Sequence, residues 1–538
     1  MASLLGGEAI AETHVPELPQ VVRVHYQTME QLQQLRALRG FQGLDWRAQY
    51  VVFELRQAGV ERLQNAGWPV QVDPLRQAEQ DRWLELDHQR SLRGNPDTIP
   101  GFSCYRTVEK THADLAALAA QYPNLTKWQV IGQSWQQQQG NPNGDAIRVL
   151  VIANQDSPHP QAPLVVMAAM HARELTTAET ATRLAEHILD NQSDPDIGWL
   201  LDHREIHIIA QHNPDGRRQV EAGVALWRKN QNTTACASGN LITSWPGIDL
   251  NRNSSFLWSN PNSSGNPCSD TYRGPVAASE PETQAIQNYL QQVFEAQRPA
   301  PDMTSPAPDD SEGVFISIHS FSELILFPWE GLGGGSNNNA PNHDALAILG
   351  RKFGFYTDYA VGRTLLGPAG GTTPDYAYGE FGVAAYTFEL GTQFQQDCDS
   401  FEQTIWPDNR DALMFAARAA RRPYQTPAGP EITAFDANVV GNQIQFTGQA
   451  ADNRYFRGFS TELPTDDPIA DVVEITVSLG VPPYLANQTY VFPVANPAVQ
   501  TPFSGNLPTG TLPPENGLIF VVASDADGAT GVPRVIAV

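Results

Sequence analysis

Between residues 101 and 423, short apolar runs alternate with amphipathic segments, and this alternation restricts the fold more than any other feature of the sequence. Several runs, such as LVVMAAM, are apolar at every position instead of at every second one. Strands of this kind are buried on both faces, which requires a central sheet with helices packed on each side. We therefore predict an α/β fold for this region. The expected strands are 128–132, 147–153, 164–170, 205–210, 314–318 and 384–390, and the expected helices are 113–121, 178–189, 282–295 and 411–420. Ser279 followed by Glu282 predicts a capping box at the start of the third helix.

The chain on either side of this region has a different pattern. At 538 residues it is too long for one hydrophobic core, and the usual domain size predicts about three domains. Residues 20–74 follow the order β-α-β-α-β, which predicts a small α+β unit, and the charged stretch 75–100 predicts a linker. Residues 430–538 have no helical period and contain short alternating runs such as VVEITVSL, so we expect a β-sandwich there.

The composition excludes some classes of protein. Lys and Arg number 34 against 59 Asp and Glu, which gives a formal net charge of −25. Such a surface argues against nucleic acid as a partner, because phosphate binding needs clustered cations. No apolar run approaches the roughly 18 residues that a membrane span requires, so we expect no span.

The cysteines bear on the cellular compartment. The first residues have neither the basic n-region nor the apolar h-region of a secretory signal, so either the protein stays inside the cell or a signal has been removed. The cysteines form no Cys-x-x-Cys pair, and three disulfide pairings are open to them. Disulfides are typical of oxidising compartments, so we expect a secreted, extracellular or periplasmic protein. Four buried free thiols in a cytosolic protein are the alternative. The four positions are Cys104, Cys236, Cys268 and Cys398.

Metal-binding side chains follow two of the expected strands. His171 and Glu174 come directly after the run that ends at 170, and His319 follows the strand 314–318. The His-x-x-Glu spacing is weak by itself, since His14 and Glu17 also match it. Ligands of open α/β sheets bind at the carboxyl ends of the strands, however, and two His with one Glu are a ligand set of catalytic zinc.

Six motifs give the chain a resemblance to a known family. In order, HAREL, NPDG, WRKN, DLNRN, SIHSFSELILFPW and YTFELG resemble the zinc metallocarboxypeptidases of the carboxypeptidase A/B/T family, over about residues 101–423. The resemblance implies a mixed central sheet flanked by helices. It also implies one Zn²⁺ per chain, held by His171, Glu174 and His319, with Asp249 orienting His171 from behind. The implied activity is hydrolysis of the C-terminal peptide bond of peptides and proteins.

The same resemblance assigns roles to five further residues. Glu389 would be the general base, and the apolar strand before it would raise its pKa into a useful range. Arg228 would stabilise the oxyanion that forms when water attacks the carbonyl. Asn251 and Arg252 would bind the terminal carboxylate of the substrate, to which a guanidinium can donate two parallel hydrogen bonds. Arg173 would contact an upstream carbonyl of the substrate.

The residues expected around the substrate side chain depart from the family. Thr373 or Pro374 should form the floor of the pocket, and neither carries a charge. Glu330 stands where branches that prefer basic C-terminal residues carry an acid, so we expect a preference for Lys or Arg; the alternative is a solvent-facing Glu. Thr387 is a further candidate contact to the substrate. Leu366 stands where the family has a mobile tyrosine, which mainly binds substrate there, so we expect activity to survive.

The resemblance extends to the disulfides and the flanking regions. It implies a bond between Cys236 and Cys268, which leaves Cys104 and Cys398 as the second pair. Residues 20–74 look like an inhibitory prosegment that is released by cleavage between about Arg76 and Arg93; a permanent accessory domain is the alternative. The C-terminal region could bind substrate, a cell surface or a partner, or only stabilise the enzyme.

Two other functions remain open on the same fold. One is a zinc amidohydrolase that acts on peptidoglycan peptides or modified amino acids, and the other is an inactive carboxypeptidase-like binding protein. Asn251 and Arg252 argue against the first, and the presence of Glu389 with all three metal ligands argues against the second. We expect a monomer whose partners are the C-termini of peptides.

Overall fold

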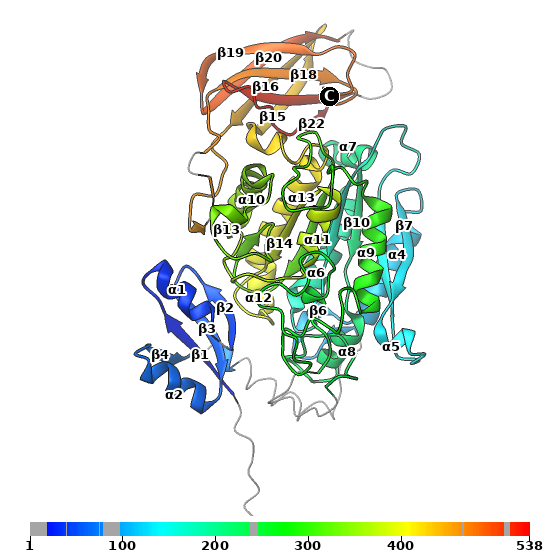
Figure 1. The fold of residues 1–538 in the computed structure, drawn as a ribbon. Helices are drawn as coiled ribbons and strands as arrows, with labels where there is room; N and C mark the ends of the chain where they lie inside the picture. Colours follow the sequence, from blue (N-terminus) through cyan, green and yellow to red (C-terminus); the bar gives the residue numbers. More distant parts are fainter. Residues whose placement is uncertain are drawn as a thin grey trace, which may run out of the picture.

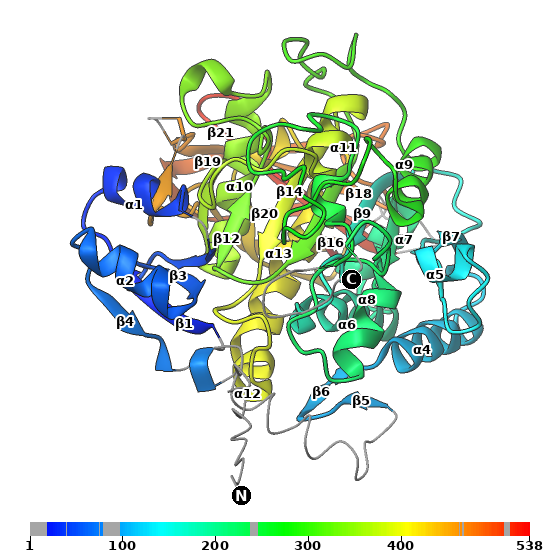
Figure 2. The same ribbon diagram turned by 60° about the horizontal axis from the view of Figure 1, so that its bottom comes forward.

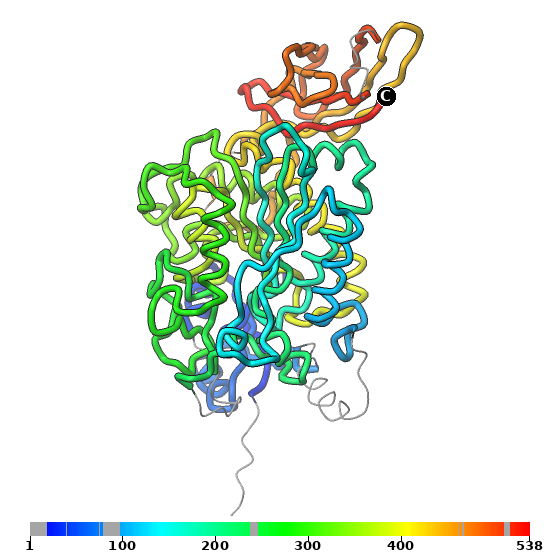
Figure 3. The backbone as a smooth tube through the Cα atoms, turned by 90° about the vertical axis from the view of Figure 1, so that its right-hand side faces the viewer, coloured from blue at the N-terminus to red at the C-terminus, as the bar shows by residue number. Residues whose placement is uncertain are grey.

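The computed structural model describes residues 19–38, 40–74, 76–78, 97–236, 246–461, 463–464, 467–509 and 517–538. A large central body carries a small N-terminal unit at one end and a layered β unit at the other, where the C-terminus lies (Figure 1). Figure 2 shows the N-terminal unit beside the central body, and Figure 3 shows the C-terminal strands stacked on its far end.

The central body is built on a mixed sheet of nine strands, in the order β17-β13-β12-β14-β11-β9-β10-β8-β7. Strands β9, β10, β11 and β14 run parallel to their neighbours in this group, and β7 and β8 pair antiparallel to theirs. Strand β12 is antiparallel to β14 but parallel to β13. The prediction of a mixed central sheet flanked by helices is confirmed (Figure 1). The strands are β7 (Thr126–Gln133), β8 (Ala146–Ile152), β9 (Ala162–Met167), β10 (Arg204–Ile209), β11 (Val314–His319), β12 (Leu324–Leu326), β13 (Ala360–Gly362), β14 (Ala384–Glu389) and β17 (Ser460–Thr461).

The central strands of this sheet are buried because their sequences are apolar almost without interruption. All six residues of β11 are buried, and Phe315 and Ile316 are completely inaccessible. Helices lie on both sides of the sheet (Figure 1). They are α4 (Val108–Gln121), α5 (Trp135–Gln138), α6 (Leu175–Asp190), α7 (Pro195–His203), α8 (Pro214–Glu221), α9 (Pro281–Val293), α10 (His343–Thr357), α11 (Thr373–Phe381), α12 (Cys398–Ser400) and α13 (Trp406–Ala419). A short hairpin, β5 (Thr98–Ile99) with β6 (Phe102–Arg106), precedes α4.

The expected capping box of α9 is wrong. The N-cap residue is Glu280, and its side chain makes no capping hydrogen bond. Ser279 Oγ donates to Glu280 Oε1 at 2.8 Å instead, while Glu282 Oε1 accepts the backbone N–H of Trp135 at 2.7 Å. Ser279 therefore bonds its chain neighbour and Glu282 bonds a distant segment, so the reciprocal bonds of a capping box do not form.

The N-terminal unit has one more strand than the sequence pattern indicated. Its sheet has the order β2-β3-β1-β4, and its elements follow the order β-α-β-β-α-β. The unexpected strand, Phe41–Asp45, is short, contains Gly43 and lacks alternation of buried and exposed residues. The elements are β1 (Gln20–His25), α1 (Met29–Arg36), β2 (Phe41–Asp45), β3 (Tyr50–Leu55), α2 (Gln57–Asn65) and β4 (Val70–Val72).

Two facing sheets form the C-terminal unit, as expected for a β-sandwich. One has the order β15-β16-β20 and the other β19-β18-β21-β22, with a core that includes Phe446, Ile475 and Val521. The strands are β15 (Glu431–Val440), β16 (Gln443–Ala451), β18 (Val472–Leu479), β19 (Tyr490–Ala498), β20 (Gln500–Pro508), β21 (Leu518–Asp525) and β22 (Arg534–Ala537). Strand β17 comes from the same part of the chain but joins the central sheet, so the two bodies share a strand across the expected boundary.

Buried charges fasten the sandwich to the central body, and two disulfides crosslink the central body itself. Glu431 at the start of the sandwich accepts from Lys352 Nζ of α10 at 3.0 Å, and also bonds Tyr356 and Arg454. Both expected disulfides are present: Cys236–Cys268 and Cys104–Cys398, with Cα–Cα distances of 5.3 and 5.6 Å. No helix among the described residues is both long and apolar enough to cross a bilayer.

Candidate metal centre and substrate site

The candidate metal ligands lie at the carboxyl ends of neighbouring strands. His171 and Glu174 belong to the loop that joins β9 to α6, and His319 is the last residue of β11. Strands β9 and β11 are adjacent and parallel, so their ends meet at one edge of the sheet. This topology brings the three side chains together, and their donor atoms all lie within 4.8 Å of one another.

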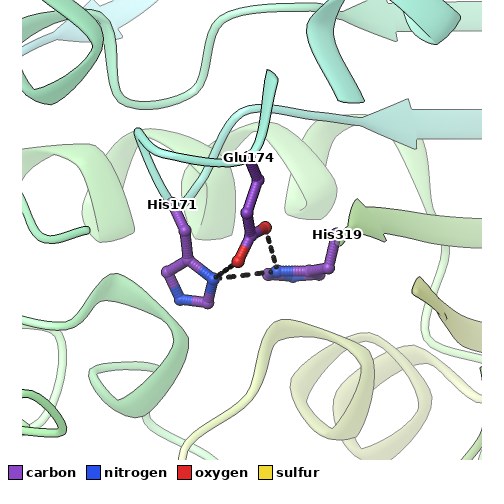
Figure 4. A group of neighbouring side chains, drawn as sticks. All are labelled: His171, Glu174 and His319. Carbon is purple, nitrogen blue, oxygen red and sulfur yellow. Dashed lines mark hydrogen bonds and ion pairs between the residues drawn. The ribbon is translucent and has the colours of Figure 1, made fainter. Parts of the chain in front are cut away.

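The three donors face a common point (Figure 4). His171 Nδ1 lies 2.7 Å from Glu174 Oε1, and His319 Nδ1 lies 3.2 Å from Glu174 Oε2. The two Nδ1 atoms are 3.1 Å apart. Each imidazole uses its outer nitrogen elsewhere: His171 Nε2 is 3.1 Å from Asp249 Oδ1, and His319 Nε2 is 2.9 Å from Ser317 Oγ.

This arrangement fits a metal ion. A neutral imidazole that donates from Nε2 presents a lone pair at Nδ1, and the lone pairs of both rings converge here on a carboxylate. Nitrogen and carboxylate oxygen are zinc donors, and the side chains are at most 3% exposed. Burial raises the pKa of Glu174, but its contacts with the two histidines lower the pKa below the usual value, which favours the ionised form that a ligand needs.

Asp249 joins the metal centre to Arg228. The Arg228 guanidinium donates to Asp249 Oδ2 from Nη2 at 2.9 Å and from Nε at 3.3 Å, while Asp249 Oδ1 faces His171. Burial opposes ionisation of Asp249, but Arg228 and the hydrogen bond to His171 keep its pKa well below the usual value. The expected orienting residue and the expected oxyanion-stabilising residue are thus in direct contact beside His171.

Glu389 is the last residue of β14 and pairs in parallel register with His319 on β11. It is partly exposed at the open edge of the sheet. Burial and the nearby charge of Glu174 raise its pKa well above the usual value, and Arg228 opposes the increase. A carboxyl with a raised pKa beside the metal ligands is suited to accept and return a proton.

Asn251 and Arg252 lie in the turn directly after Asp249. The backbone N–H of Asn251 donates to Asp249 Oδ1 at 3.0 Å. Asn251 is 7% exposed, and its Oδ1 has no hydrogen-bond partner among the described residues. Among the described residues, the Arg252 guanidinium donates only to backbone carbonyls, those of Asn251 at 2.8 Å and Asn262 at 3.0 Å. No carboxylate among the described residues forms an ion pair with this guanidinium.

Glu330 is buried, so the alternative of a solvent-facing Glu is wrong. It is 4% exposed, and Thr387 Oγ1 donates to its Oε1 at 2.7 Å. Burial raises the pKa of Glu330 to about 7, partly opposed by that hydrogen bond and by Arg252. Asp375, which was not anticipated, accepts the backbone N–H groups of Glu330 and Gly331 at 2.8 and 2.7 Å. Its own pKa is raised well above the usual value by burial and by Glu330.

The N-terminal unit lies against this edge of the central body. Arg173 donates to Gln42 Oε1 of β2 at 3.2 Å and stacks over the Phe394 ring at 4.0 Å. Leu44 N donates to Ser322 Oγ at 3.1 Å. A small cavity of about 40 Å³ lies between the two bodies, bounded in part by Glu54.

Arg76 and Leu366 both lie where the N-terminal unit contacts the central body. Arg76 was an expected cleavage point, but it is 6% exposed, pairs with Asp73 and donates to Thr392 O at 2.5 Å. It is therefore part of the docked unit, and the remaining expected cleavage points lie outside the described residues. Leu366 packs against the core of the N-terminal unit, and Arg36 of α1 donates to the carbonyls of the residues just before it.

Some contributors to the site could not be read from the motifs. Ser317 lies two residues before His319 and therefore on the same side of β11, which is a signal that strand periodicity offers. Asp375 and Gln42 carry no such signal, because their partners are distant in sequence. Thr373, which was expected in the pocket floor, is completely buried at the start of α11 and lies 3.4 Å from Ser254 through its hydroxyl.

Comparisons with known proteins agree with this geometry. Zinc carboxypeptidase A 1 of Anopheles gambiae is 29% identical over 315 residues, which cover 57% of this chain and 63% of that protein, so less than two thirds of the relative is spanned. Carboxypeptidase B of Astacus astacus is 28% identical over 302 residues, 54% of this chain and 87% of that protein. The structure of carboxypeptidase A from Helicoverpa armigera has a similar fold, with a TM-score of 0.58, 23% identity, and coverage of 76% of this chain and 98% of that one. The family described as zinc carboxypeptidase matches residues 111–414, more than half of the chain, and the protein belongs to this family, whose metal is zinc.

Proposed function

We propose that the protein is a zinc-dependent metallocarboxypeptidase that hydrolyses the C-terminal peptide bond of peptides and proteins. The observation that carries this proposal is the position of Arg252, three residues after the Asp249 that supports His171. Within the part of the chain that the structure describes, its guanidinium bonds only carbonyls. A free cation beside a metal centre suits a substrate that ends in a carboxylate. An endopeptidase binds no terminal carboxylate and would not need this cation.

The residues divide the chemistry among them. When bound, Zn²⁺ supplies a Lewis acid and lowers the pKa of water. Glu389 takes the proton from the attacking water and returns it to the leaving amine, for which its raised pKa is suited. Arg228 stabilises negative charge on the carbonyl oxygen, and its link to Asp249 fixes its position. Asn251 and Arg252 hold the terminal carboxylate, and Arg173 binds an upstream carbonyl.

The substrate preference rests on Glu330. We assign Glu330 and Thr387 to the pocket for the C-terminal side chain, where the carboxylate pairs with the cation of Lys or Arg. Its burial supports this role, because a buried charge without a partner is costly and a cationic side chain would remove that cost.

The N-terminal unit acts in this proposal as an inhibitory prosegment. The hydrogen bond between Arg173 and Gln42 supports it, since it occupies an expected substrate contact. Cleavage of the chain after residue 78 would then be required for activity. The two disulfides support a secreted, extracellular or periplasmic location. We further propose that the enzyme is a monomer.

The proposal is tested by mass spectrometry of matched peptides after incubation with zinc-loaded protein, both uncut and cut between residues 78 and 97. The peptides end in free Lys, Arg, Phe or Leu, and one Lys peptide carries a C-terminal amide. Loss of single residues from free ends only, absent with Glu389→Gln, is expected. Cleavage of the amidated peptide would overturn the exopeptidase assignment. Activity on peptidoglycan peptides alone would favour the amidohydrolase alternative, and no hydrolysis of any substrate would favour an inactive binding protein.

A further inference from the structure

A segment of the C-terminal unit leaves the sandwich and runs along the central body. After β16, residues 452–461 contact helix α10 and end in β17. Strand β17 pairs in parallel with β13 (Val361 with Ser460, Gly362 with Thr461). Phe456 N donates to Arg351 O at 2.9 Å, and Arg351 Nε donates back to Phe456 O at 3.1 Å. In Figure 1 this orange segment descends from the sandwich towards the blue N-terminal unit.

The segment presents two phenylalanine rings to the N-terminal unit. The Trp46 ring lies 6.0 Å from Phe459 at an interplanar angle of 12°, and 6.0 Å from Phe456 at 88°. The first is a stacked pair and the second an edge contact, the two arrangements that aromatic rings favour. Phe459 packs against the same core cluster as Trp46, that of the N-terminal unit.

Trp46 is therefore held by all three parts of the chain. Its indole N–H donates to Glu323 O of the central body at 3.2 Å. The guanidinium of its neighbour Arg47 lies 4.4 Å above the indole ring, pairs with Glu323 and donates to Asp358 O at 2.6 Å. The two phenylalanines complete the enclosure from the C-terminal side.

The two rings also help to anchor the segment, because Phe456 is buried in the hydrophobic core of the central body and Phe459 packs against that core. The backbone pairing of β17 and the exchange between Phe456 and Arg351 anchor the segment to the central body without any contact to Trp46. Besides this anchoring, the contacts of both rings with Trp46 form a binding surface for the N-terminal unit.

We propose that the C-terminal unit supplies part of the docking surface for the N-terminal unit, through Phe456 and Phe459 acting on Trp46. Cutting the chain between residues 78 and 97 then does not by itself release the N-terminal unit, which stays bound until it dissociates from both bodies. The docking claim does not depend on inhibition, whereas its consequence for activity rests on the proposed prosegment role.

The test uses the full chain with a specific protease site placed between residues 78 and 97. After cutting, size-exclusion chromatography and native mass spectrometry at a series of concentrations give the dissociation constant of the N-terminal unit. Each aromatic pair contributes roughly 3- to 10-fold in affinity, so the double change Phe456→Ala with Phe459→Ala should weaken binding at least about tenfold. Phe355→Ala, on an exposed ring of α10 that makes no contact with Trp46, is the control and should leave the constant unchanged.

A double-mutant cycle guards against a variant that simply folds poorly. Trp46→Ala and Phe459→Ala, alone and combined, should show non-additive losses, because both remove the same contact. Additive losses, or a double phenylalanine variant that binds as tightly as the unaltered protein, would overturn the proposal. Peptidase activity is measured in parallel: an active complex with the N-terminal unit still bound would refute the inhibitory role and leave the docking proposal intact.

Discussion

Replacing Glu330 by Gln should reverse the expected preference for basic C-terminal residues. The exchange preserves the size of the side chain and an oxygen that can accept from Thr387 Oγ1, now at 2.7 Å, but removes the negative charge. Because Glu330 is 4% exposed, water can hardly replace that charge. A bound Lys side chain would then be a buried cation without its partner.

The size of the effect follows from this burial. Removing one partner of a buried ion pair costs about 3–5 kcal/mol. At the lower value, kcat/KM for a peptide ending in Lys should fall roughly 100-fold. A peptide ending in Leu should be cleaved at an unchanged or higher rate, because no partner is lost. The ratio of the two kcat/KM values is therefore the quantity to measure.

The pH dependence gives a second signature. Burial raises the pKa of Glu330 to about 7, so the group is neutral below that pH and ionised above it, while the Lys ammonium stays charged throughout. The Lys-to-Leu ratio should rise as pH increases through about 7 in the unaltered enzyme and stay flat in Glu330→Gln. The folded carboxyl also holds its proton more tightly than the unfolded one, so its contribution to stability is greatest at low pH and is lost as pH rises through 7.

Both ratios are obtained from competition assays with paired peptides followed by mass spectrometry. Glu295→Gln, which makes the same change at an exposed position, controls for the altered net charge. If Glu330→Gln leaves the Lys-to-Leu ratio within twofold of the unaltered enzyme at pH 8, Glu330 does not select the substrate side chain.

Three further changes test other parts of the structure. Glu389→Gln should lower kcat by roughly 10²- to 10⁴-fold with little change in KM, since a general base acts in the transition state; a loss confined to KM would contradict this role. Gly43→Leu should activate the uncut chain, because a Cβ at this position would lie 2.6 Å from the Phe321 ring and push β2 away. If the uncut, folded variant has no peptidase activity, β2 does not carry the inhibition. Glu431→Gln should lower the free energy of unfolding by about 3 kcal/mol in a urea titration, because it leaves the fully buried Lys352 ammonium without its carboxylate; a loss below about 1 kcal/mol would show that water reaches the pair.

The sequence predicted the parts of the structure that depend on local pattern. The strands β9 and β11 are apolar at nearly every position, and the ligands at their ends follow from the parallel register. Sequence periodicity could not predict β2, whose buried residues do not alternate. It also could not predict the burial of Glu330, whose backbone N–H bonds the distant Asp375 of α11. Both features are decided by packing between segments that are distant along the chain.

The local sequence pattern also could not predict the domain boundaries. The composition changes near residue 430, yet β17 returns thirty residues later to the central sheet, and nothing in its two residues signals this. Arg76 lies in a charged stretch that reads as a linker, but its side chain is buried against Asp73 and Phe321. The sequence does not show whether an arginine is buried or solvated, because that depends on the residues that the fold packs around it.

The strand shared between the two bodies limits how the protein can be shortened. In a chain ending at 423, β13 would become the outermost strand of the central sheet, with the N–H and C=O groups that now bond β17 left open. Such an edge is a template for pairing with other molecules, and β13 is apolar and lacks the charged or proline residues that normally prevent it. The C-terminal unit thus serves as a cap on the sheet, and the shortened protein should aggregate through this edge even if its metal centre folds correctly.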